Sequence, residues 1–113
     1  PLAGVGARTE DFWHIGMAHG FYVEHDDPMR SSLITADEIA ASGLDYLAMG
    51  HVHVFHEYQH GDTLACYPGT PMPGYGAGSR GGSVAIVDFV PGAGVSIAEH
   101  PLAIERAAEA ASA

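Results

Sequence analysis

Residues 44–53 read LDYLAMGHVH, an apolar run that ends in glycine and is followed by two histidines separated by one residue. A short apolar run of this kind predicts a buried β-strand over residues 44–49. In an extended backbone, residues two apart point to the same face, so His51 and His53 can address one point in space. Gly50 in front of them permits a sharp turn or a close approach by other groups. Because neutral imidazole is a common metal ligand, the pattern indicates either a metal site or two solvent-facing strand histidines.

A capping box lies just upstream of this strand and predicts a short helix over residues 36–42. The Thr35 hydroxyl can accept a hydrogen bond from the Glu38 amide, while the Glu38 carboxylate reaches back to the start of the helix. Gly43 supplies the left-handed residue that commonly ends a helix.

A second apolar run, residues 12–19, also ends in a histidine that stands beside a glycine. It predicts a buried strand, followed by a polar loop over residues 20–33. Functional residues gather at strand ends in α/β proteins, so His19 is either a further candidate ligand or a hydrogen-bonded histidine at a strand end.

The second half of the chain has the composition of β-strands. Alternating and apolar segments predict a hairpin, a loop rich in Gly and Pro, and two further strands; these are residues 54–59 with 63–67, residues 68–82, and residues 83–90 with 95–102. The order strand, helix, strand and then several strands predicts an α/β fold with a strand-rich second half. Residues 1–11 look like a lead-in segment, and residues 103–113 like an Ala-rich tail or linker.

Charge and cysteine content restrict the class of protein. The 113 residues contain four arginines and no lysine against 14 acidic residues, a net charge of −10. This balance argues against a basic surface that follows a nucleic-acid backbone. The single cysteine, Cys66, excludes a disulfide within the chain and is expected to be a small core residue. No apolar run reaches the roughly 18 residues of a membrane-spanning helix, so we expect a cytoplasmic protein without membrane partners.

Three segments together resemble the second half of a calcineurin-like metallophosphoesterase, and most closely the SbcD-type exonucleases of DNA double-strand-break repair. They read IGMAHG, LDYLAMGHVH and CYPGTP, at residues 15–20, 44–53 and 66–71. The resemblance implies that residues 12–102 form the C-terminal, strand-rich half of a four-layer α-β-β-α sandwich.

The resemblance also implies a two-metal site, with manganese as the expected metal and iron or zinc as alternatives. His19 and His51 would bind the second metal, and His53 would bind the first. The two ions would activate a water for in-line attack on phosphorus. An acidic chain can therefore still act on a phosphoester, because the cations balance the charge.

Three motifs of the family's first half are missing before His19: Asp-x-His, Gly-Asp-x-x-Asp and Gly-Asn-His followed by an acid. The chain contains no asparagine at all. We therefore expect the C-terminal half of a catalytic domain, with the N-terminal half as its partner and no catalytic side chain of its own beyond the metal ligands. A phosphodiesterase of small phosphoesters, a non-catalytic metal-binding module and an interaction fragment that pairs with a second copy remain alternatives.

Overall fold

The computed structural model describes Leu2 and residues 12–27, 31–71 and 82–102. The rest of the lead-in segment, most of the Gly-rich loop and the tail from residue 103 lie outside the described residues. The elements are β1 (Ile15–His19), β2 (Phe21–Val23), β3 (Leu33–Thr35), α1 (Ala36–Ala41), β4 (Tyr46–Gly50), β5 (Phe55–His60), β6 (Thr63–Pro68), β7 (Ser83–Val90) and β8 (Gly94–Pro101). The described part is mixed α/β and rich in strands, as the sequence predicts.

A four-stranded sheet forms the centre, with the strand order β1-β4-β6-β5. Strands β1, β4 and β6 are parallel, while β5 returns antiparallel to β6 as the expected hairpin. Two smaller sheets accompany it: the parallel pair β2-β3 and the antiparallel hairpin β7-β8.

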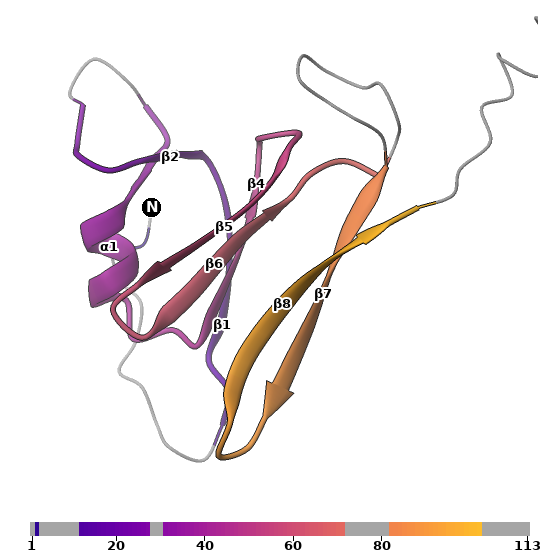
Figure 1. Cartoon of the computed structure of the whole chain (residues 1–113). Helices are drawn as coiled ribbons and strands as arrows, with labels where there is room; N and C mark the ends of the chain where they lie inside the picture. Colours follow the sequence, from indigo (N-terminus) through magenta and orange to yellow (C-terminus); the bar gives the residue numbers. More distant parts are fainter. Residues whose placement is uncertain (1, 3–11, 28–30, 72–81, 103–113) are drawn as a thin grey trace, which may run out of the picture.

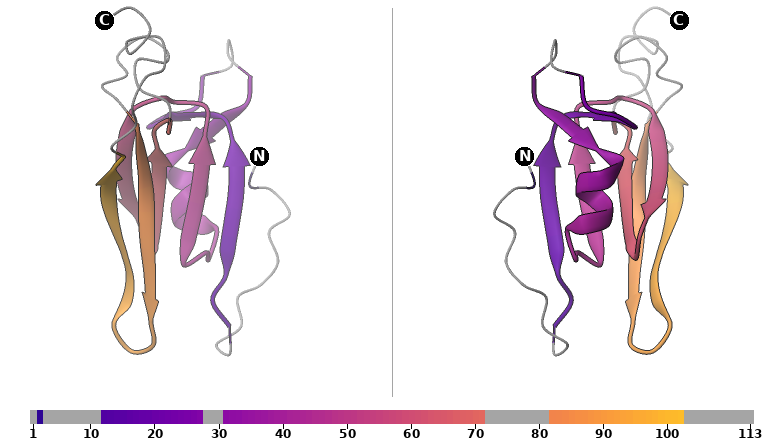
Figure 2. Two further views of the ribbon diagram at one scale, coloured as in Figure 1. Left: turned by 90° about the vertical axis from the view of Figure 1, so that its right-hand side faces the viewer. Right: turned by 90° about the vertical axis from the view of Figure 1, so that its left-hand side faces the viewer.

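The elements are arranged in layers, with α1 on one face of the central sheet and the β7-β8 hairpin on the other (Figures 1 and 2). The hairpin is held partly by aromatic contacts. The Phe89 ring lies 5.5 Å from the Trp13 ring and 6.0 Å from the Tyr46 ring, measured between centroids. Aromatic pairs at such distances contribute about 0.5–1.5 kcal/mol each, which helps to hold the hairpin against the sheet.

The helix begins with the predicted capping box. The Thr35 hydroxyl accepts a hydrogen bond from the Glu38 amide at 3.1 Å, and the Glu38 carboxylate accepts one from the Thr35 amide at 3.2 Å. The helix buries Ile39 completely against the sheet. The buried cluster consists of Ile34, Ile39, Leu44, Leu47, Met49, Ala65 and Tyr67. Most of the described core therefore lies between α1 and the central sheet.

Two expectations need correction. Strand β1 is not buried: its side chains alternate between exposed and half-buried, because it forms an edge of the sheet and pairs only with β4 among the described strands. The expected loop over residues 20–33 contains β2 and leads directly into β3. These two strands have three residues each, which is too short for a recognisable alternation of side chains.

Candidate functional site

Two parallel strands end side by side at the candidate site. The last residue of β1, His19, pairs in register with the last residue of β4, Gly50. The carboxyl ends of parallel strands meet at one edge of a sheet. His19 at the end of β1 and His51, which directly follows Gly50 of β4, are therefore brought to the same place. The sequence predicted candidate ligands at both strand ends, and the topology explains why they meet.

The imidazole rings of His19 and His51 are in contact. Their centroids are 5.3 Å apart and their planes are inclined by 76°. A Cβ atom added to Gly50 would lie 3.3 Å from Nδ1 of His19, so the glycine leaves room for the ring over the strand end. The Phe21 ring also contacts His51, with its centroid 5.9 Å away and an edge-to-face inclination of 71°.

His51 has an unusual backbone conformation, with φ of 123°. A histidine in this region carries a conformational cost of about 1–3 kcal/mol and keeps it only when the surroundings impose it. Such strain is concentrated at functional sites, although structural turns also show it. His51 is therefore the residue of this strand end with an unfavourable backbone conformation.

The turn that follows His19 is held by three hydrogen bonds, of which the one from Tyr67 to Gly20 is buried. The Gly20 amide donates to the Gly50 carbonyl at 3.1 Å. The Tyr67 hydroxyl donates to the Gly20 carbonyl at 2.7 Å and accepts from the Tyr22 amide at 2.7 Å. Burial raises the pKa of Tyr67, while the bond from the Tyr22 amide acts in the opposite direction. The hydroxyl therefore stays protonated near neutral pH and can donate to Gly20.

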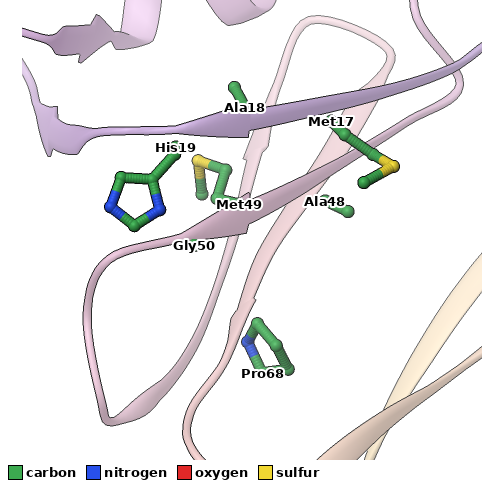
Figure 3. Close-up of a pocket in the computed structure, with 7 residues that line it drawn as sticks. All are labelled: Met17, Ala18, His19, Ala48, Met49, Gly50 and Pro68. Atoms are coloured by element: carbon green, nitrogen blue, oxygen red, sulfur yellow. The ribbon is translucent and has the colours of Figure 1, made fainter.

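An apolar concavity with a volume of about 420 Å³ adjoins His19. Figure 3 shows His19 at one end, next to Gly50 and Met49, with Met17 farther back along β1. The lining residues are Met17, Ala18, His19, Ala48, Met49, Gly50 and Pro68. The Met17 side chain is 86% exposed. The face of the sheet beside the candidate site is thus apolar and open.

The structure does not bring the third predicted ligand into one group with the other two. His53 is exposed and lies in the segment between β4 and β5. Within residues 12–27, 31–71 and 82–102, no cluster of three or more His, Cys, Asp or Glu side chains is arranged to hold a metal ion. The described residues therefore bring two predicted ligands together, but the three histidines do not form one metal-binding group.

The histidine pair is compatible with a shared metal ion. With metal–nitrogen bonds of about 2.1 Å, two imidazoles on one tetrahedral ion have their centroids about 5 Å apart, close to the observed 5.3 Å. Two nitrogen ligands are fewer than the three or four protein ligands of a typical catalytic or structural zinc site. The pair would supply at most two of these ligands, and the others would come from outside it.

Sequence reasoning missed the residues that hold the turn. Tyr67 lies in a segment that supports the family resemblance, but nothing in the spacing marks its hydroxyl as a partner of Gly20 and Tyr22. Cys66 is fully buried, and burial raises the pKa of its thiol to about 11, with a further contribution from the charge of Glu57. This confirms Cys66 as a core residue.

Comparison with known proteins gives no relative: no family model, curated protein or solved structure matches the chain. Among the described residues there is also no helix with the length and apolar character needed to cross a membrane.

Proposed function

We propose that this chain is part of a two-metal phosphoesterase domain of the calcineurin-like type. His19 and His51 bind one divalent ion, manganese or alternatively iron or zinc, and His53 contributes to the second. Bound ions of this kind polarise the phosphoester and lower the pKa of a water molecule. The observation that carries the proposal is the contact between two imidazoles at neighbouring strand ends, with His51 in a strained conformation.

The order of layers supports the same proposal. A helix, a mostly parallel sheet and a β-hairpin follow one another across the described part, as three successive layers of an α-β-β-α sandwich would (Figure 1). In the proposal the N-terminal half of the domain supplies the other metal ligands, including the bridging carboxylate. The role of this chain is to hold imidazoles in place, without a catalytic acid or base.

The family resemblance extends the proposal to DNA as substrate, cleaved by an exonuclease. The net charge supports a second candidate, a small phosphoester. The chain carries four arginines and no lysine against 14 acidic residues, a net charge of −10. Such a balance is unfavourable for a surface that follows the phosphates of a DNA strand. A free buried thiol suits a reducing compartment, so we place the protein in the cytoplasm.

Manganese binding can be tested by NMR even if the affinity is low. Sub-stoichiometric Mn²⁺ broadens the resonances of nearby nuclei, so the imidazole signals of all eight histidines are followed in one titration. We expect His19 and His51 to broaden first and together. His100, exposed on β8, is the internal control.

Substitutions decide whether the broadening reports one shared ion. His51→Ala should abolish the effect at His19, and His19→Ala should abolish it at His51, while His100→Ala leaves both unchanged. Earlier broadening of the acidic loop residues Asp26 and Asp27 would contradict the proposal. The isolated chain should not hydrolyse bis(4-nitrophenyl) phosphate with Mn²⁺, because the bridging carboxylate belongs to the other half of the domain.

A further inference from the structure

The hydroxyl of Tyr67 is a buried group that connects strand β6 with the turn after β1. The Tyr67 side chain is only 1% exposed, and its hydroxyl both donates to the Gly20 carbonyl and accepts from the Tyr22 amide. Loss of this oxygen would leave two backbone groups without their partner in a part-buried site. Unsatisfied polar groups of this kind are costly, so the turn depends on the hydroxyl.

The two bonds of Tyr67 hold both ends of one short segment. Gly20 directly follows His19, and Tyr22 directly follows Phe21. The other side of the turn is fixed by the bond from the Gly20 amide to the Gly50 carbonyl. A side chain at position 20 would collide with the Ser32 carbonyl oxygen, so only glycine fits. The turn is therefore held by Tyr67, by the Gly50 carbonyl and by the close approach of the Ser32 carbonyl.

Two rings that contact His51 flank Gly20 of this segment. His19 ends β1 just before Gly20 and Phe21 begins β2 just after it, and the centroids of their rings are 5.3 Å and 5.9 Å from that of the His51 ring. His51 needs such support because its φ of 123° is unfavourable for a residue with a Cβ atom. We infer that Tyr67 is a positioning residue: its hydroxyl fixes the turn that places His19 and Phe21 against His51. The relevance to metal binding rests on the proposed function.

The test compares two tyrosines that lose the same atom. Tyr67→Phe removes the hydroxyl at the turn. Tyr46→Phe is the matched control, because Tyr46 is also buried but its hydroxyl bonds to Cys66 on the hairpin side of the sheet. Without metal, the nuclear Overhauser contacts between the His19 and His51 rings should be lost in Tyr67→Phe and kept in Tyr46→Phe. A general loss of stability would affect both variants alike.

Manganese titration gives the second measurement. We expect about tenfold weaker Mn²⁺ binding in Tyr67→Phe, because a tenfold change corresponds to about 1.4 kcal/mol, the size of one hydrogen bond. Tyr46→Phe should bind like the unchanged chain. If Tyr67→Phe is unfolded in buffer, trimethylamine N-oxide restores the compact state and the ring contacts are measured there.

The outcomes separate the two proposals. Unchanged contacts between His19 and His51 in folded Tyr67→Phe overturn the positioning role. Contacts that depend on Tyr67, in a chain whose histidines Mn²⁺ never broadens, support the positioning role and overturn the metal-binding function instead.

Discussion

His51 has a backbone conformation that glycine adopts more easily than histidine. We predict that His51→Gly raises the free energy of unfolding by about 1 kcal/mol. Glycine relieves the backbone strain, but part of this gain is offset because glycine loses more conformational entropy on folding. The same substitution should abolish the manganese effect at His19. Urea denaturation measures the first quantity. His56→Gly, in the regular strand β5, is the control and should destabilise the chain. A destabilised His51→Gly would show that the strain is absent or is repaid by ring contacts.

Cys66 gives a prediction for alkaline pH. The folded thiol has its pKa raised to about 11 by burial and by the nearby charge of Glu57, from an ordinary value of 9.0. The unfolded chain therefore loses this proton first, so the contribution of the thiol to the free energy of unfolding should be constant below about pH 9 and fall as the pH rises towards 11. Cys66→Ala should reduce this slope between pH 9 and 10, in urea titrations at fixed pH. An identical slope in the variant would assign it to other groups.

The candidate residues at the site could be read from the sequence, but their geometry could not. Glycine followed by histidine at one strand end, and histidine followed by glycine at another, was enough to select His51 and His19. The strained φ of His51 and the bonds of Tyr67 arise from contacts between residues far apart in the chain, as in the bond from Tyr67 to Gly20. Short-range patterns contain no information on such contacts.

At the level of elements, α1 depends strongly on its first residue. The helix has six residues, too few to be stable without capping and packing. Thr35→Ala removes the hydroxyl that accepts from the Glu38 amide and should lower the free energy of unfolding by about 1 kcal/mol. Asp37→Ala, in the same first turn but exposed, is the control and should cost less. Equal effects in urea denaturation would contradict a specific role for the capping box.

Elements with a local signal were predicted, and elements without one were missed. The capping box located α1 to within one residue, and the alternation of side chains located the β5-β6 hairpin. Strands β2 and β3 were missed because each has only three residues, and they are strands because they pair with each other. The error over β1 has a different cause: the apolar character of the strand was clear, but its position at the sheet edge depends on the whole sheet.

At the scale of the whole molecule, the apolar edge strand contrasts with the acidic chain. Ile15 and Met17 of β1 are 54% and 86% exposed, while the chain carries a net charge of −10. Strand edges are normally protected by charges or proline, and residues 15–19 contain no Lys, Arg, Asp, Glu or Pro. Among the described strands β1 pairs only with β4, and we expect a strand of another half-domain, or of a second copy, to pair with its other edge.

We therefore predict that the isolated chain associates with itself through β1. Antiparallel pairing centred on Met17 is self-complementary, because it places Ile15 of each copy opposite His19 of the other. Two chains of charge −10 repel each other, so the association should strengthen as salt screens the repulsion.

Met17→Lys should weaken this association at every salt concentration, since like charges would then face each other across the new strand pair. Ile86→Lys, on the exposed face of β7, is the control and should have a much smaller effect. Sedimentation velocity over a range of protein and salt concentrations measures this. A chain that stays monomeric throughout, or an Ile86→Lys variant that dissociates like Met17→Lys, would show that β1 is not the contact.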